Sequence, residues 1–221
     1  MAIEHNREFI KDWLNAIRDN PLLVDPIKKF ILEELQNFAK EKLSSVAGIS
    51  ELKDIVDLAQ VVDNINELGK LELVISGLVY SLAAGEMKLS GTIGPITKGV
   101  ILTSFKELNK RIWRDLKLED KSLKGIIDFY VKYLVETEQI KDGDIEFVSV
   151  DDSSAKLRFR NDPFAVAIRH VIDKLGNVDL GNICLRGLSV VAFVRTVTEE
   201  ILDLKVESFS DDECVISLNF F

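Results

Sequence analysis

The sequence predicts an α+β fold in which amphipathic helices are followed by a small antiparallel sheet packed against helices. Over most of the chain, apolar residues recur at spacings of three and four, the period of a helix with one buried face. After Gly143 the period changes to two, which is typical of strands, and short polar turns join these segments in pairs. Helices therefore dominate the first part of the chain, and strands occur only near its end.

Composition restricts the class of protein. The chain has 221 residues, of which 47% are hydrophobic and 29% are charged, the balance of a soluble globular protein with a substantial core. The net charge of −9 opposes binding to nucleic acid or to anionic lipid, because both of these partners attract a basic surface. We therefore expect no nucleic-acid partner.

The sequence also predicts a cytoplasmic protein with no integral membrane segment. The N-terminus has no apolar signal core, and the longest apolar run, residues 71–84, contains Glu72 and is shorter than a membrane span. Two cysteines are too few for a disulfide framework. Many Lys and Glu residues beside few Gln and Cys are typical of thermophiles, so an archaeal-like source is expected.

Residues 1–90 are predicted to be helical. The segments with clear boundaries are residues 4–19, a helix that begins at Asp25 with Pro26 in its first position, and a helix from Ser50 that stops at Gly69. Residues 71–89 fit either a buried helix or two short strands around Gly77, because the apolar period does not separate the two, and we favour the helix.

Residues 90–99, SGTIGPITKG, contain three glycines and a proline and form the best candidate for a domain boundary. We therefore divide the chain into a helical N-terminal segment, residues 1–90, and a second domain, residues 91–221. A phosphate-binding loop is another interpretation of these glycines. The segment lacks the Gly-Lys-Ser/Thr ending of such a loop, and Pro95 removes an amide donor, so we expect an ordinary loop.

The second domain is predicted to alternate between helices and hairpins. Its segments are a helix at 96–116, a helix at 122–139, strands at 144–150 and 155–160, a helix at 162–176, a helix at 187–204, and strands at 205–210 and 214–221. In the strand 155–160, Ala, Leu and Phe alternate with Lys and Arg, which predicts a sheet with one buried face and one solvent-exposed face.

Several features near the C-terminus form a pattern of their own. Cys184 and Gly187 make a C-x-x-G step, an amphipathic helix follows, and Cys214 opens the last strand of a hairpin. With the hairpin and helix before it, this order resembles the 4-vinyl reductase domain, which shares a superfamily with the TRAPP vesicle-tethering subunits and the haem-NO-binding domains. The resemblance covers residues 91–221. The turn before Cys214 is short and lacks a further cysteine that many family members carry there.

The resemblance implies a pocket between helices and sheet that holds a small apolar molecule, such as a hydrocarbon, a lipid or a tetrapyrrole-like compound. It also implies a regulatory role and a homodimer, because both are common among relatives. The implied function is therefore binding or sensing of this ligand without catalysis. The identity of any cofactor stays open. The competing hypothesis is a protein-interaction or scaffold protein whose core is filled.

Aromatic residues on the helices of the second domain are candidates for the pocket walls, although their helical spacing also fits an ordinary core. Arg186, beside Gly187 at a helix start, is a candidate for holding a ligand carboxylate, or else a residue of the pocket rim. The full set of candidate ligand-binding residues is Phe105, Phe129, Tyr130, Tyr133, Phe164, Cys184, Arg186 and Phe193.

Metal and catalytic roles have little support in the sequence. Structural zinc needs four nitrogen or sulfur ligands, and the two cysteines and two histidines show no finger-like spacing, so no metal site is predicted. A third hypothesis is an enzyme with Cys184 as nucleophile and His170 as base, which requires hydrogen-bond reach between them. Both cysteines also fit the role of small buried apolar residues. A disulfide between Cys184 and Cys214 depends on their Cα geometry and stays open.

Overall fold

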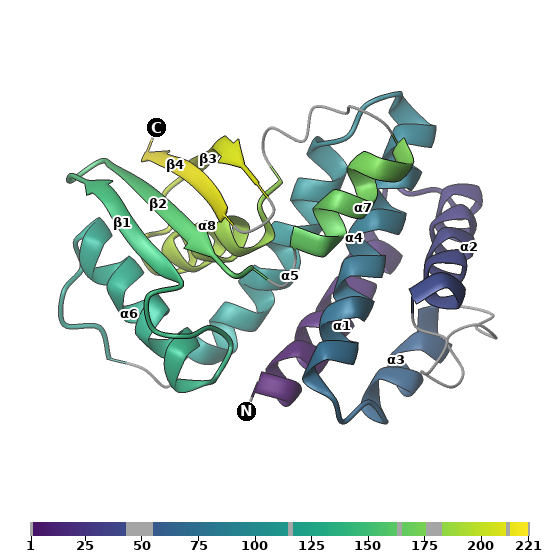
Figure 1. The fold of residues 1–221 in the computed structure, drawn as a ribbon, viewed down its shortest axis with the longest axis horizontal. Helices are drawn as coiled ribbons and strands as arrows, with labels where there is room; N and C mark the ends of the chain where they lie inside the picture. The colour runs from purple at the N-terminus through teal and green to yellow at the C-terminus, as the bar shows by residue number, and fades with distance from the viewer. Residues whose placement is uncertain are drawn as a thin grey trace. The chain divides into compact units, whose positions relative to one another are not determined.

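The computed structural model describes residues 2–42, 55–114, 117–162, 165–175, 183–210 and 213–220. Within these ranges the chain forms eight helices and one four-stranded antiparallel sheet, which confirms the predicted α+β class (Figure 1). The elements are α1 (Ala2–Asp19), α2 (Asp25–Lys42), α3 (Ile55–Asp63), α4 (Leu68–Ser90), α5 (Pro95–Arg114), α6 (Leu123–Glu136), β1 (Ile145–Val150), β2 (Ser154–Arg160), α7 (Ala165–Leu175), α8 (Leu185–Thr198), β3 (Leu202–Phe209) and β4 (Glu213–Phe220).

The chain divides into two compact units. Unit 1 contains residues 1–2, 105–162 and 181–221, and therefore holds α6, α8 and the whole sheet. Unit 2 contains residues 3–104 and 163–180, and therefore holds α1 to α4 together with α7. The boundary expected near residue 90 lies within unit 2. Whether residues 1–90 form a domain of their own stays a prediction.

Unit 2 is built around α4, which confirms that residues 71–89 are helical. Leu71 and an unbroken run from Val74 to Glu86 are buried, and both α2 and α7 pack against this helix. A helix that is apolar on every side needs neighbours on every side. Two glycines allow α2 to approach closely, because a Cβ at Gly77 would lie 2.8 Å from Phe38 Cδ1, and one at Gly85 would lie 2.5 Å from Ile31 Cγ1.

By length and composition, α4 is the one helix in the described part of the chain that could cross a membrane. It has 23 residues, so it is longer than the apolar run of residues 71–84 that the sequence suggested. However, 72% of its apolar window is buried within the structure, as in the core helix of a soluble protein. One such helix is weak evidence for a membrane segment.

A buried carboxylate fixes the connection from α4 to α5. Glu86 is 1% exposed, and its two oxygens accept hydrogen bonds from the backbone N–H groups of Ile96 and Thr97, each at 2.8 Å, and from the Thr97 hydroxyl at 2.6 Å. The first N–H groups of a helix lack partners within the helix and favour a negative charge. Glu86 therefore occupies the position that an anion would take at this helix start. Of the residues 90–99 that were expected to form a loop, only residues 91–94 lie between the helices, because α4 ends at Ser90 and α5 begins at Pro95.

The third helix differs from its prediction. The sequence suggested one helix from Ser50 to a stop at Gly69, but α3 ends at Asp63 and Gly69 lies in the first turn of α4. Ser50 lies outside the described residues. The backbone N–H groups of Asn64 and Ile65 donate to Val61 O and Val62 O at 3.1 Å, so a tight turn ends α3.

In unit 1 the four strands are ordered β1-β2-β4-β3, with every neighbour antiparallel. Opposite residues on the inner face are apolar and buried: Ala155 faces Leu218, Leu157 faces Ile216, and Phe159 faces Cys214. α6 packs against β1 and β2, and α8 packs against β3 and α6. The register shifts once in β1, between Phe147 and Ser149, and once in β3, between Val206 and Ser208.

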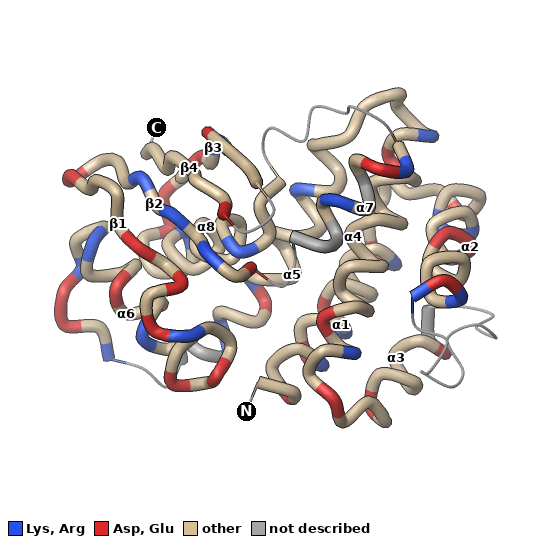
Figure 2. The backbone as a smooth tube through the Cα atoms, in the orientation of Figure 1, with Lys and Arg blue, Asp and Glu red and all other residues tan. Residues whose placement is uncertain are grey.

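The outer face of the sheet is charged, as the alternation in residues 155–160 predicted. Arg160 pairs with Glu146 at 2.8 Å, and Arg158 pairs with Glu213 at 3.2 Å, so the basic strand β2 lies between acidic residues of its two neighbours. Figure 2 shows the blue of β2 beside the red of β1. Exposed ion pairs of this kind contribute about 0–1 kcal/mol each to stability. The main effect of these charges is therefore to keep this face of the sheet exposed to solvent.

α8 is the central helix of unit 1, and its end differs from the prediction. Residues Leu185–Val194 are all buried. The helix was expected to continue to residue 204, but it ends at Thr198, where Glu199 adopts a left-handed conformation with φ 61°. Leu202 and Leu204 consequently belong to β3, and their side chains reach the core from the sheet.

The contact between α4 and α2 predicts the effect of two matched substitutions. Gly85→Ala should lower the free energy of unfolding by about 1–3 kcal/mol, because the added methyl group meets the buried Ile31 side chain. Gly69→Ala, in the same helix but with nothing within 4 Å of the added Cβ, should be neutral or stabilise by up to about 1 kcal/mol. Urea unfolding of both variants measures the difference, and equal effects would contradict the close packing of α2 on α4.

Candidate functional site

The structure brings five of the eight candidate residues together in unit 1. We use the name α6–α8 cluster for Phe129, Tyr130 and Tyr133 of α6, Arg186, Ser189 and Phe193 of α8, and Gln139, which follows α6. The two helices pack against each other and against the sheet. The cluster therefore lies where these helices and the sheet meet, and whether its residues line a pocket stays a prediction.

Four aromatic rings of the cluster form a stack. The ring centroids of Tyr130 and Phe193 are 4.5 Å apart with an interplanar angle of 15°, and those of Phe129 and Phe193 are 6.1 Å apart with an angle of 13°. Tyr133 stacks on Tyr130 at 6.4 Å. Tyr130 is 1% exposed and Phe193 is 0% exposed. Stacked rings in direct contact form a flat apolar wall, and they also fill the space between the helices.

Three hydrogen-bond donors lie at the polar side of this wall. Arg186 is 4% exposed, and its Nη2 donates to the Gln139 backbone carbonyl at 3.3 Å. The side-chain Nε2 of Gln139 and the hydroxyl of Tyr130 are buried and have no hydrogen-bond partner among the described residues. Arg186 is therefore not a rim residue but part of the interior. Buried donors of this kind favour an occupant rich in acceptor atoms.

The surroundings of Tyr130 keep its hydroxyl protonated. Burial raises the pKa of Tyr130 to about 12, and the nearby Ser189 and Arg186 oppose this rise without cancelling it. Ser189 donates its own hydroxyl hydrogen to the Arg186 carbonyl at 2.6 Å. It lies close enough to Tyr130 to influence this pKa, but it does not give the phenol a hydrogen bond of good geometry. The phenol is thus a neutral donor at physiological pH.

The remaining candidates lie elsewhere or outside the described residues. Phe105 is buried on α5, and Phe164 lies outside the described residues. Cys184 lies at the start of α8, where it packs toward the sheet rather than the ring stack. Asn109 was missed by the sequence analysis, although both its amide atoms are buried and unpartnered among the described residues. Its position four residues after Phe105, on an apolar stripe, was the available signal.

Cys184 and Cys214 meet at the contact between α8 and β4. Cys184 caps α8, and its sulfur accepts a hydrogen bond from the Gly187 backbone N–H at 3.3 Å. A Cβ on Gly187 would lie 2.7 Å from Leu204 Cδ1 and 2.9 Å from Ile216 Cδ1, so the glycine permits the close approach of helix and sheet. The two cysteines are 2% exposed and form no disulfide. The C-x-x-G step therefore has a packing role.

The thiol of Cys184 is a poor nucleophile in this environment. A hydrogen bond with the Cys214 thiol, together with burial, holds the pKa of Cys184 well above its usual value. A nucleophilic cysteine needs a lowered pKa and access to substrate. The side chain of His170 lies outside the described residues, and in the described part of the chain no group of three or more His, Cys, Asp or Glu residues is arranged to hold a metal ion.

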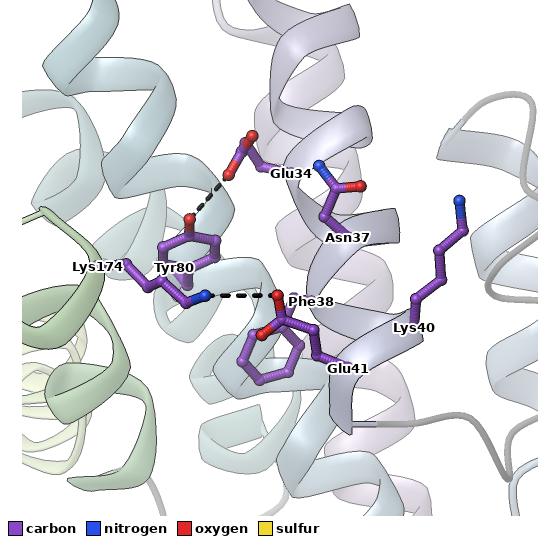
Figure 3. Close-up of a pocket in the computed structure, with 7 residues that line it drawn as sticks. All are labelled: Glu34, Asn37, Phe38, Lys40, Glu41, Tyr80 and Lys174. Atoms are coloured by element: carbon purple, nitrogen blue, oxygen red, sulfur yellow. Dashed lines mark hydrogen bonds and ion pairs between the residues drawn. The ribbon is translucent and has the colours of Figure 1, made fainter.

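Unit 2 contains a groove of about 390 Å³ that the sequence analysis missed. Its walls come from α2, α4 and α7 and consist of Glu34, Asn37, Phe38, Lys40, Glu41, Tyr80 and Lys174 (Figure 3). The volume falls within the range of small-molecule sites, roughly 300–1,000 Å³. A recurring alternation of rings and carboxylates on α2 was the signal in the sequence that could have identified it.

Comparisons with known proteins do not identify a family. No protein-family model matches the chain, and no curated protein matches it. One solved structure, described as "Probing the function of heme distortion in the H-NOX family", matches with 10% identity over 96% of this chain and 93% of that chain, at a TM-score of 0.42. A likeness at this level supports no argument about fold or function. The resemblance to the 4-vinyl reductase domain therefore stays a prediction.

The unpartnered phenol of Tyr130 predicts how Tyr130→Phe will behave. At neutral pH the substitution should cost less than about 1 kcal/mol, because no complete hydrogen bond is lost. Above pH of about 10 the unfolded tyrosine ionises while the folded one stays protonated to about 12, so wild-type stability falls with rising pH. Between pH of about 10 and about 12, the free energy of unfolding should therefore fall by up to about 3 kcal/mol less in the variant than in the wild type.

Urea unfolding at neutral pH and at about pH 11 measures both effects. Tyr80 and Tyr133 also have raised pKa values, so part of the alkaline loss should remain in the variant. A cost well above 1 kcal/mol at neutral pH would show that the hydroxyl has a partner in solution.

The environment of Cys184 predicts slow alkylation. Both thiols should react with iodoacetamide at least about a hundredfold more slowly in the native protein than in urea, because burial hides them and the pKa of Cys184 is raised. Mass spectrometry of the alkylated protein counts the modified thiols over time. A native Cys184 that reacts as fast as a free thiol would restore the hypothesis of a cysteine-dependent enzyme.

Proposed function

We propose that this chain is a non-catalytic protein that binds or senses a small, largely apolar molecule in unit 1. The molecule would lie against the aromatic wall of the α6–α8 cluster and direct an acceptor-rich group, such as a carboxylate, toward Arg186. This proposal keeps the function that the resemblance implies and adds the polar head group. The order of α6, β1, β2, α7, α8, β3 and β4 is the order of helices and hairpins on which that resemblance rests, and it supports the proposal.

One observation carries the proposal: α6, α8 and the residues after α6 bring buried hydrogen-bond donors to an apolar interior. The Tyr130 hydroxyl and Gln139 Nε2 are buried without partners among the described residues. The buried Arg186 guanidinium donates to the Gln139 backbone carbonyl, and its charge acts on Tyr130. A buried unsatisfied donor costs about 1–3 kcal/mol. A ligand that brings acceptor atoms to this point would recover that cost, and a guanidinium fork fits a carboxylate in two-pronged geometry.

A second function is favoured by the ring stack itself. Tyr130 and Phe193 touch each other and are fully buried, so the cluster also fits an interaction or scaffold protein whose core is filled. An ordered water at the donors would then replace the ligand head group, since a water accepts from two donors in a site of this polarity. The two functions differ in what the purified protein carries.

Native mass spectrometry distinguishes the ligand-binding function from the scaffold function. The wild-type protein should carry a non-covalent adduct that is lost on denaturation and recovered by solvent extraction. Arg186→Gln should reduce adduct occupancy about tenfold, because a charged hydrogen bond is lost. Arg160→Gln, on the charged outer face of the sheet, is the matched control and should leave the occupancy unchanged. The same spectra report the homodimer that we propose for the regulatory form.

Two outcomes would overturn the ligand proposal. The first is a wild-type protein that carries no adduct and yields no extractable organic molecule, which would favour the scaffold function. The second is an adduct whose occupancy falls equally in Arg186→Gln and Arg160→Gln, which would place it outside the cluster. Tyr130→Phe gives a second test of the same position if the arginine variant fails to fold.

A further inference from the structure

The groove of unit 2 has a chemistry of its own, independent of the ligand proposed for unit 1. In Figure 3, Glu34 extends from α2 toward Tyr80 of α4, and Glu41 lies by the Phe38 ring and faces Lys174. The Tyr80 hydroxyl donates to Glu34 Oε2 at 2.8 Å, and its ring stacks on Phe38 with centroids 6.1 Å apart. The groove thus has an aromatic floor with a carboxylate at each end.

The spacing along α2 sets the distance between these carboxylates. Phe30, Glu34, Phe38 and Glu41 follow one another at intervals of four, four and three residues, so they share one face of the helix. Glu34 and Glu41 are separated by two helical turns, which corresponds to about 10 Å along the axis. Rings and acidic groups therefore alternate along this face.

Two lysines of unit 2 show which kind of group this face accepts. The ammonium of Lys174, from α7, lies 3.4 Å from Glu41 Oε1 inside the groove. The ammonium of Lys88, from α4, lies 3.7 Å from the centre of the Phe30 ring, one turn before Glu34. An ammonium over an aromatic face and an ammonium beside a carboxylate are the two contacts by which proteins hold an alkylamine. Both contacts are already made here by the chain's own side chains.

Two carboxylates act on the Tyr80 hydroxyl in the groove. Burial, the hydrogen bond to Glu34 and the charges of Glu34 and Glu41 all raise the pKa of Tyr80, so its hydroxyl stays neutral and both carboxylates act on the same point. Lys40 extends away from Tyr80 and Lys174 in Figure 3. The ammonium of Lys174 therefore offsets the negative charge of Glu41 in the groove. The Lys174 side chain is 47% exposed, so it can leave the groove without unfolding the helix.

We propose that this groove binds a linear aliphatic polyamine, with one ammonium at Glu34, a second at Glu41 and the methylene chain over Phe38 and Tyr80. The terminal nitrogens of spermidine are separated by about the distance between the two carboxylates. Binding displaces Lys174 from Glu41, so this lysine acts as an internal competitor. An anionic ligand does not fit, because both carboxylates face the place it would take.

Isothermal titration calorimetry with spermidine tests the proposal on the full chain. The wild-type protein should bind one equivalent with an affinity that falls as salt rises. Glu34→Gln and Glu41→Gln should each weaken binding about fivefold or more, because one ammonium loses its carboxylate. Lys174→Met should tighten binding, since the competitor is removed. Propylamine, with one nitrogen, should bind more weakly than spermidine to the wild type.

Glu33→Gln is the matched control. Glu33 lies beside Glu34 on the same helix but is exposed, and it pairs with Lys29 at 4.0 Å. Its substitution should leave spermidine affinity unchanged. Equal weakening by Glu33→Gln would show diffuse attraction to a chain of net charge −9 and would overturn the proposal. Absence of saturable binding in both the wild type and Lys174→Met would overturn it as well. All of the substituted side chains are exposed or half-buried, so each variant should fold.

Discussion

The fold depends on enclosing two helices that have no polar face. α4 is buried from Val74 to Glu86 and α8 from Leu185 to Val194, so each unit must supply apolar neighbours around a whole helix rather than against one stripe. Any polar group inside such a unit must find its partner there. Glu86 does so at the start of α5, whereas the Tyr130 hydroxyl, like both amide atoms of Asn109, has no hydrogen-bond partner among the described residues.

Much of the fold could be predicted because apolar period reports directly on local structure. The strands, the turn at residues 151–154 and most helices were found in this way. The two errors have a common cause. α8 ends at Glu199, a non-glycine residue in the left-handed region, and α3 ends at a turn without proline or glycine, so neither end carries the usual sequence signal. Gly77 was ambiguous because its role, close contact with Phe38, is tertiary.

The candidate sites were less accessible to sequence reasoning. The aromatic residues singled out on α6 and α8 lie next to one another, but their role in a pocket stays a prediction. The burial of Arg186 depends on how α8 packs in unit 1, and that information is not local. The groove of unit 2 draws on α2, α4 and α7, and the alternation of rings and carboxylates on α2 gave no indication that Tyr80 of α4 and Lys174 of α7 lie beside it. The contact between Cys184 and Cys214 likewise appears only once α8 is placed against β4.

The register shifts in β1 and β3 bear on how copies of this chain can associate. These two strands form the borders of the sheet, and among the described residues each has a neighbouring strand on one side only. A regular row of free N–H and C=O groups on such a side invites a strand from another molecule, and an irregularity in the row prevents continuous pairing. The two irregular edges therefore oppose the continuous strand pairing by which sheets of neighbouring copies would merge into fibrils.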